Sequence, residues 1–254
     1  MTEMVHGSIP THVGEPVLSR WWRTVDRWTI SCVLLLMGVG LLLALASSPP
    51  LAMRHGLSPF HYFQRHAVFV ALSVSVMLLV SMRSPETIRR WAVLGFAIGF
   101  ATLLALPVIG SDFGKGAVRW LNLGFTTLQP SEFVKPCLTV TSAWLLAAGA
   151  DLNGPPGRRL SLLLTGATVG LLVIQPDFGQ AALVLFGWGA MYFVSGASMM
   201  IILALAGVVA VGGFAAYTSS EHFARRIDAF LSSEVDGRSQ IGYATSAIQE
   251  GGLF

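Results

Sequence analysis

The sequence has few charged residues for its length. Asp, Glu, Lys and Arg make up 11% of the 254 residues, whereas soluble domains carry roughly 25%. Hydrophobic residues account for 54%, and the mean hydropathy is +0.67. A water-soluble fold of this length could not bury so much apolar surface. The composition therefore excludes an ordinary soluble domain and predicts a protein for which lipid is the main solvent.

Cysteine is also scarce, and its positions exclude several kinds of site. Cys32 and Cys137 each lie alone in an apolar run, so neither a disulfide framework nor a Cys-x-x-Cys metal motif is expected. The six histidines form no His-x-x-x-His pair, so the sequence carries no signal for a metal site. The net charge is +3, but the basic residues lie in short clusters between apolar runs. This pattern is typical of membrane loops and argues against nucleic acid as a partner.

Seven apolar segments predict an all-α fold, a polytopic transmembrane helical bundle with seven spans. The expected spans are residues 28–47, 67–82, 91–110, 131–150, 160–174, 179–195 and 198–217. A spanning helix needs about 20 residues, so the apolar run from Leu160 to Gly196 is too long for one span and is divided at Pro176. After the first span we expect a loop that contains Pro49, Pro50 and Pro59.

Arginine and lysine in the short loops predict the orientation. One side of the membrane carries Arg20, Arg23, Arg27, Arg83, Arg89, Arg90, Arg158 and Arg159. The other side carries Arg54, Arg65, Lys115 and Arg119. Since the richer side is cytoplasmic, we expect a cytoplasmic tail at 1–27, the transmembrane region at 28–217 and an external segment at 218–254. A signal peptide cleaved near Ala44-Leu45-Ala46 is disfavoured, because the polar leader is long and further spans follow.

Two pairs of glycines have the spacing that allows helices to approach closely. Gly95 and Gly99 lie four residues apart in the third span, and Gly166 and Gly170 do so in the fifth. Each pair puts small residues on one helix face, so we expect both to be packing positions.

The most informative polar residues lie at the start of the fourth span. Glu132 and Lys135 are three apart and share a helix face. Pro130 suits the first helical position, and Glu132 suits the positive N-terminal end. The pair is interpreted either as a snorkelling pair near the outer interface or, as we favour, as part of a polar cavity. Ser131 with Lys135 would make a conceivable Ser–Lys nucleophile, although the Ser-x-x-Lys spacing is absent.

Three further residues have both a plain interpretation and a functional one. Asp177 follows Pro176 and suits a helix N-cap, which we favour over a role in chemistry. Arg119 could hold a phosphate and Trp120 an interfacial lipid, and both also suit ordinary interface anchors. Gln129 and Arg119 flank the same external mouth as the Glu132–Lys135 pair, which would extend one polar, cationic surface.

Several motifs in order along the chain resemble the SEDS family (shape, elongation, division and sporulation proteins). They are RWLNLG at 119–124, QPSEFVK at 129–135, QPDFGQ at 175–180, RIDAFL at 226–231, IGYATSAI at 241–248 and GGLF at 251–254. Each motif is weak alone, but the ordered set is specific. Gln175 and Phe178 look more like the division branch of the family than the elongation branch.

The resemblance implies a fold and an activity. Family members have ten helices, with a large external loop between the seventh and eighth. They are peptidoglycan glycosyltransferases that polymerise lipid II into glycan strands at the outer face of the bacterial inner membrane. The division branch implies a place at the septum and, as partners, a class B penicillin-binding protein that supplies the transpeptidase, together with other division proteins. No cofactor is evident from the sequence, and use of a divalent cation stays an open alternative.

The resemblance also implies roles for residues of this sequence. Arg119 and Lys135 are candidate cations for the departing pyrophosphate, and Glu132 would hold Lys135. The family's essential aspartate lies in a His-Thr-Asp-Phe motif late in the external loop. The sequence given stops at Phe254, before such a motif and three further helices, so we expect this stretch to be inactive by itself. A lipid-linked precursor transporter (flippase) and a scaffold of the division machinery stay open as alternative functions.

Overall fold

A computed structural model of the chain describes residues 17–111, 118–124, 126–151, 154–219, 221–231 and 240–251. Lys115 and the first 16 residues, which the topology prediction used, lie outside these ranges. The structure divides into two compact units, residues 1–90 and 91–254, which are described separately below. The helix α4 (Pro85–Ile109) begins in the first unit and continues into the second.

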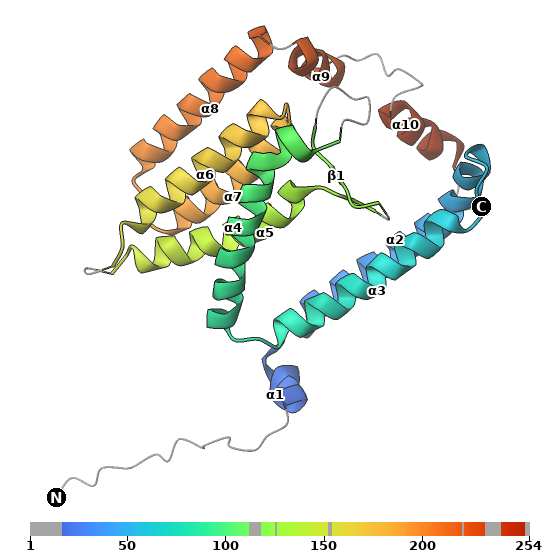
Figure 1. Cartoon of the computed structure of the whole chain (residues 1–254), viewed down its shortest axis with the longest axis horizontal. Helices are drawn as coiled ribbons and strands as arrows, with labels where there is room; N and C mark the ends of the chain where they lie inside the picture. Colours follow the sequence, from blue (N-terminus) through green and yellow to red (C-terminus); the bar gives the residue numbers. More distant parts are fainter. Residues whose placement is uncertain are drawn as a thin grey trace, which may run out of the picture. The chain divides into compact units, whose positions relative to one another are not determined.

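The first unit is built around a helical hairpin. It consists of α1 (Val17–Thr24), α2 (Arg27–Arg54) and α3 (His61–Ser81), and α2 and α3 lie side by side (Figure 1). Asp26 caps α2, because its carboxylate accepts hydrogen bonds from the Trp28 backbone N–H at 3.0 Å and from the Thr29 hydroxyl at 2.6 Å. Gly56 ends the turn after α2 in a left-handed conformation, with φ +67°.

The prediction of a loop at Pro49 and Pro50 is wrong, because α2 continues through both prolines. Transmembrane helices tolerate proline where neighbouring groups hold the freed backbone. Ser48, which is 1% exposed, donates to the Pro59 carbonyl at 2.9 Å and accepts from the Phe63 backbone N–H at 3.2 Å. These two bonds hold this turn of α2 against the start of α3.

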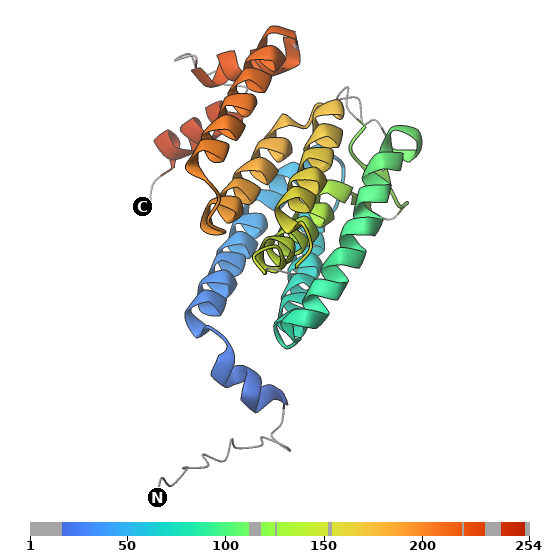
Figure 2. The same cartoon turned by 90° about the vertical axis from the view of Figure 1, so that its left-hand side faces the viewer.

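The second unit contains a layer of three neighbouring helices, α5 (Pro130–Ala148), α6 (Gly157–Ile174) and α7 (Phe178–Val194), as Figures 1 and 2 show. The structure confirms the predicted break, because α6 ends before Pro176 and α7 begins after Asp177. Trp188, late in α7, donates to the Ser161 hydroxyl, early in α6, at 2.6 Å. The two helices are therefore antiparallel.

The core of this unit lies where α4 packs on the three-helix layer. Its buried side chains are Phe96, Leu103 and Leu106 of α4, Val134 and Leu138 of α5, Leu172 of α6, and Ala181 and Val184 of α7. A second cluster joins α5 to α7 through Leu146, Trp188 and Tyr192. The remaining helices of this unit are α8 (Met199–Ser219), α9 (Glu221–Leu231) and α10 (Gln240–Glu250).

The two predicted glycine pairs behave differently. A Cβ atom on Gly95 would lie 2.8 Å from Cys137 Sγ, and one on Gly99 would lie 2.8 Å from Val134 Cγ2. The first pair therefore allows α4 to approach α5, as predicted. Nothing lies within 4 Å of a Cβ atom on Gly166 or Gly170, so close packing at the second pair is not found. Local spacing is the same in both pairs, but only the first has a helix packed against it.

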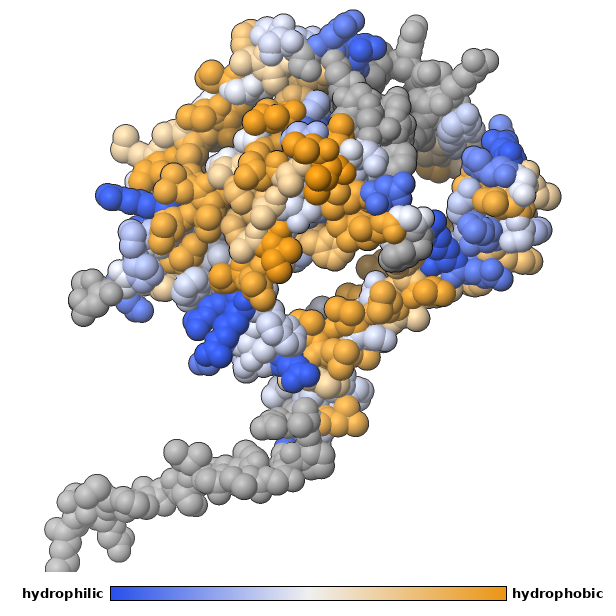
Figure 3. All heavy atoms as spheres, in the orientation of Figure 1, coloured by the Kyte–Doolittle hydropathy of each residue, from blue (hydrophilic) through white to orange (hydrophobic). Residues whose placement is uncertain are grey.

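Five of the described helices are long and apolar enough to cross a membrane. They are α2, α3, α4, α6 and α8. The helix α7 is apolar but has 17 residues, and α5 carries Glu132 and Lys135. The helices match the seven predicted segments in order, while the number that span the bilayer stays a prediction. Large hydrophobic side chains cover much of their outer surface (Figure 3), as expected where lipid replaces water.

Candidate functional site

A short β-hairpin brings two of the candidate residues together. Strands β1 (Leu121–Asn122) and β2 (Thr127–Leu128) pair antiparallel, with Leu121 opposite Leu128. Gly124 supplies the positive φ of +85° that the turn needs. Arg119 lies just before β1 and Gln129 just after β2. The hairpin therefore brings both side chains close to each other despite their separation in sequence.

Arg119 holds the turn between α6 and α7. Its Nε donates to the Gln175 carbonyl at 3.1 Å, its Nη2 donates to the Pro176 carbonyl, and its Nη1 lies 3.7 Å from the Asp177 carboxylate. The carbonyls at a helix C-terminus have no partner within the helix, so the guanidinium satisfies groups that would otherwise be left unpaired. Arg119 is committed to this turn, and a phosphate-binding role for it stays a prediction.

Asp177 occupies the N-cap position of α7, as predicted, but its side chain makes no capping hydrogen bond. The residue is 7% exposed and points toward Arg119 and Gln129. Gln129 Nε2 lies 3.4 Å from the Asp177 carboxylate and donates to the Ser131 hydroxyl at 3.0 Å. Asp177 therefore has the position of a cap, but the prediction that its side chain caps the helix is wrong. The carboxylate instead faces Arg119, which lies 58 residues earlier in the sequence (177 minus 119) and is brought close by the hairpin.

The predicted pair between Glu132 and Lys135 is present. Lys135 Nζ lies 2.8 Å from Glu132 Oε2 and donates to Gln180 Oε1, on α7, at 2.6 Å. Gln180 Nε2 donates in turn to Glu132 Oε1 at 3.0 Å. The Lys135 side chain is 19% exposed, whereas that of Glu132 is 48% exposed. In the favoured polar-cavity interpretation both side chains would face the interior, but Glu132 lies at the rim.

Two other candidates have separate positions. Ser131 is 3% exposed, and its hydroxyl accepts from Gln129. Among the described residues no side-chain hydrogen bond joins the Ser131 hydroxyl to the Lys135 ammonium, so the structure gives no support to a Ser–Lys nucleophile. Trp120 is 38% exposed and pairs through its backbone with Ser111 in an isolated bridge. Its proposed contact with interfacial lipid stays a prediction.

Two polar clusters thus lie side by side at one end of the three-helix layer. The first contains Arg119, Gln129, Ser131 and Asp177, and the second contains Glu132, Lys135 and Gln180. Because both clusters join the first turns of α5 and α7, the two helix N-termini lie at the same end, where their dipoles favour negative charge. Sequence reasoning missed Gln180, since its partners are 45 and 48 residues away.

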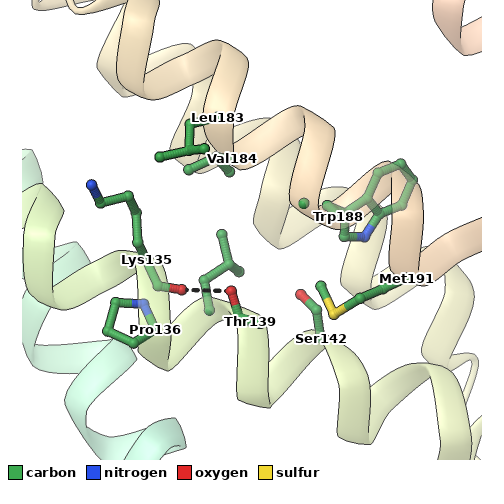
Figure 4. Close-up of a pocket in the computed structure, with 10 residues that line it drawn as sticks. Lys135, Pro136, Thr139, Ser142, Leu183, Val184, Trp188 and Met191 are labelled. Carbon is green, nitrogen blue, oxygen red and sulfur yellow. Dashed lines mark hydrogen bonds between the residues drawn. The ribbon is translucent and has the colours of Figure 1, made fainter. Parts of the chain in front are cut away.

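An open pocket runs along α5 and α7 from Lys135, with a volume of about 330 Å³ (Figure 4). Lys135 and Pro136 lie near one end, Trp188 and Met191 near the other, and Thr139 lies between them. Apolar side chains make most of its wall, so the pocket combines one cation with a hydrocarbon-like surface. Within the described residues, no group of three or more His, Cys, Asp or Glu side chains is placed to hold a metal ion.

Long apolar helices with large exposed hydrophobic side chains define a polytopic helical membrane protein. A comparison with family models refines this class. The FTSW_RODA_SPOVE model, described as cell cycle protein, matches residues 26–254. The chain belongs to this family.

Curated relatives support the same assignment. The chain is 41% identical over 238 residues to the probable peptidoglycan glycosyltransferase FtsW of Caulobacter vibrioides, covering 93% of this chain and 61% of the relative. It is 29% identical over 239 residues to the protein of that description from Coxiella burnetii, covering 90% and 63%. The chain thus spans about three fifths of the length of these relatives.

Solved structures show a similar fold. The rod shape determining protein RodA of Thermus thermophilus matches with a TM-score of 0.52 and 28% identity, over 68% of this chain and 58% of that one. A second match has a TM-score of 0.59 and 25% identity, over 84% of this chain and 66% of the other. It comes from a study of polymerization and crosslinking by a peptidoglycan synthase complex.

Proposed function

We propose that this protein is a peptidoglycan glycosyltransferase that polymerises lipid II into glycan strands during bacterial cell division. The observation that carries the proposal is the position of Lys135, a cation at one end of an apolar pocket. A lipid-linked donor has the matching chemistry, with a pyrophosphate next to a long hydrocarbon chain. Family membership and the likeness to proteins described as FtsW support the same activity.

Lys135 would act on the leaving group. Glycosyl transfer from a pyrophosphate-linked donor builds negative charge on the departing phosphate, and a fixed cation stabilises that charge. The ammonium of Lys135 has three N–H donors. In the part of the chain that the structure describes, two of them are directed to Glu132 and Gln180. The third is left for a phosphate oxygen.

The reaction also needs a base to activate the attacking sugar hydroxyl. Asp177 does not suit this role, because Arg119 and Gln129 already hold its carboxylate. The family resemblance puts the essential aspartate in the external loop instead. No catalytic residue is therefore assigned to the described residues, and Arg119, Gln129, Glu132 and Lys135 are proposed to line the substrate cavity, with Ser131, Trp120 and Asp177 beside it.

The same proposal includes a place in the cell. We infer a multi-pass protein of the bacterial inner membrane, at the division septum, with a cytoplasmic N-terminus and an external segment at 218–254. The arginine distribution supports the orientation. Cysteine accessibility labelling in intact cells tests it, and external labelling of a cysteine placed at Ser84 would refute it. The likeness to a solved peptidoglycan synthase complex supports a class B penicillin-binding protein as the crosslinking partner.

Polymerisation of lipid II by the purified whole protein, with and without its transpeptidase partner, tests the activity. Glycan strands are expected when the protein is present, and their length should fall when Lys135 is replaced. Movement of lipid II across vesicle membranes without any glycan would instead favour the transporter. A Glu132 substitution that abolishes cell division while partner recruitment continues would argue against a scaffold.

A further inference from the structure

The side chain of Gln180 closes a ring of three polar groups. It lies in the first turn of α7 and reaches across to α5. Its Oε1 accepts from Lys135 Nζ at 2.6 Å, and its Nε2 donates to Glu132 Oε1 at 3.0 Å. The third side of the ring is the Lys135–Glu132 ion pair at 2.8 Å. Every member therefore bonds to both of the others.

An amide is well suited to this position. The ring needs an acceptor for the ammonium and a donor for the carboxylate, and an amide side chain carries both. A carboxylate would accept from Lys135 but could not donate to Glu132. A hydroxyl is too short to span the two groups. The chemistry of the ring therefore selects a Gln side chain over the other polar side chains of similar length.

We propose that Gln180 is a positioning residue that fixes the ammonium of Lys135 in the orientation needed for the departing phosphate, an inference that rests on the proposed function. An ion pair three residues apart on one helix is weak and does not fix a long side chain. Gln180 adds an anchor from a second helix. When two N–H groups of the Lys135 ammonium are hydrogen-bonded, the direction of its third N–H group is fixed.

The ring also links the two walls of the pocket. Lys135 lines the pocket from α5, while Leu183, Val184 and Trp188 line it from the helix that carries Gln180. A shift between α5 and α7 would therefore break the hydrogen bonds of Gln180 and change the width of the pocket together. Positioning of the cation and the shape of the apolar wall are coupled through this one side chain.

Lysine labelling reads the position of Lys135 without any enzyme assay. The sequence contains two lysines, Lys115 and Lys135, so Lys115 serves as an internal reference. The whole protein is acylated briefly with a limiting amine reagent, and the labelling ratio of the two lysines is measured by mass spectrometry. Gln180→Leu should raise the Lys135 to Lys115 ratio by about 10-fold, the lower end of the range for one lost hydrogen bond to a charged group. An unchanged ratio would overturn the proposal.

Glycan synthesis by the same variants tests the effect on catalysis. Gln180→Leu should lower kcat by about 10- to 100-fold, the size expected from hydrogen bonds to a charged group. Gln64→Glu and Gln64→Leu, at an exposed position of α3 outside the site, are the matched controls and should behave as the parent protein does. Loss of kcat in the controls as well would show a general effect on folding and overturn the assignment to Gln180.

Gln180→Glu gives a readout that a purely structural role would not produce. The introduced carboxylate faces Glu132, and the two carboxylates beside Lys135 can share one proton as the pH falls. One shared proton restores a donor toward Glu132. Activity relative to the parent protein should therefore be low near pH 8 and recover as the pH falls toward 6, whereas Gln180→Leu should show no recovery. A constant ratio across this range would count against the proposal.

The two assays separate this inference from the proposed function. If the parent protein makes no glycan while Gln180→Leu still raises the labelling ratio of Lys135, the proposed function fails and the positioning of Lys135 stands. If the parent protein makes glycan and neither the labelling ratio nor kcat depends on Gln180, the positioning role fails and the proposed function stands.

Discussion

The α2–α3 hairpin and the α5–α7 layer are held together in different ways. In the hairpin, α3 has no buried residues and α2 buries Ser48 and Ala52. In contrast, α5 alone buries eight residues, three of which are Ser or Thr. Both hairpin helices are long and apolar enough to span a membrane, while α5 is not among the helices that meet this criterion. The more deeply packed helix is therefore the one that does not meet this criterion.

This difference follows from the solvent. Lipid is as apolar as leucine, so a hydrophobic side chain gains little by leaving it, and helices associate through small residues and polar contacts instead. The α5–α7 layer has both, with Gly95 and Gly99 on the α4 side and two polar clusters at the helix N-termini. The hairpin has Ser48 as its buried polar contact. Substitutions should therefore have their largest effects in the layer.

Replacing Lys135 tests the comparison with the largest expected effect. Lys135→Ala should lower lipid II polymerisation about 100-fold or more, the loss typical for one group that stabilises transition-state charge. Glu132→Ala should come close to it, with a smaller effect on folding because Glu132 is half exposed. Glycan yield from the purified whole protein is the measurement.

The double variant Glu132→Ala/Lys135→Ala separates two roles for the pair. If the pair only supports the fold, losing both charges should restore much of the activity, because no charge is left stranded. If Lys135 contacts the pyrophosphate, the double variant should be as inactive as Lys135→Ala. We expect the second outcome.

The next largest effect is expected at Arg119. Its substitution should lower the stability of the fold rather than remove a charge at the substrate. Arg119→Met removes the donors that hold the Gln175 and Pro176 carbonyls and strands Asp177. The expected destabilisation is about 1.5–3 kcal/mol, the range for hydrogen bonds to charged groups, and thermal unfolding in detergent measures it. Adding Asp177→Asn should recover part of this loss. Arg119→Lys should not substitute fully, because an ammonium lacks the guanidinium fork.

The two glycine pairs provide a smaller, matched test. Gly99→Ala puts a Cβ atom 2.8 Å from Cγ2 of the buried Val134, so the Val134 side chain or one of the helices must shift, at a cost of about 1–3 kcal/mol. Gly170→Ala meets nothing within 4 Å and should stabilise its helix by about 0.5–1 kcal/mol, since alanine loses less entropy on folding. Opposite shifts in thermal midpoint are expected. Equal shifts would mean that packing does not distinguish the two pairs.

Local sequence signals predicted the features that depend on neighbours in the chain. The break at Pro176, the proline at the start of α5 and the Glu132–Lys135 pair are all confirmed, because each follows from spacing within one or two helical turns. The passage of α2 through Pro49 and Pro50 was missed, because a proline pair locally indicates a helix break, and the contact of the adjacent Ser48 with the start of α3 is not visible in sequence spacing.

The site itself shows the same limit. In the sequence Asp177 has the pattern of a helix cap, and only the folded hairpin brings Arg119 to it. The partners of Gln180 lie on α5, so no residue of its own helix indicates its role. The helices that face each other across the site decide both roles, and a single sequence does not say which helices these are. The motif resemblance identified the family without placing either contact.

The smallest expected effect lies in the hairpin, at the cap of α2. Asp26 is exposed, and its bonds to the Thr29 hydroxyl and the Trp28 backbone N–H lower the pKa of its carboxyl below the usual value near 3.8. A carboxyl whose pKa is lower in the folded state stabilises that state fully above its unfolded pKa, and the contribution disappears as the pH falls through the folded pKa. Amide exchange in the first turn of α2, at Trp28 and Thr29, should therefore have a constant rate from pH 7 to about 5, after correction for intrinsic rates, and the corrected rate should rise below about pH 4.

Two variants of Asp26 test this prediction. Asp26→Ala should raise that exchange at all pH values and remove the pH step, while Asp26→Asn, which keeps an acceptor for the cap, should remove the step with a smaller rise. Glycan synthesis should be unchanged in both variants, because the α2–α3 hairpin carries none of the residues proposed to line the substrate cavity.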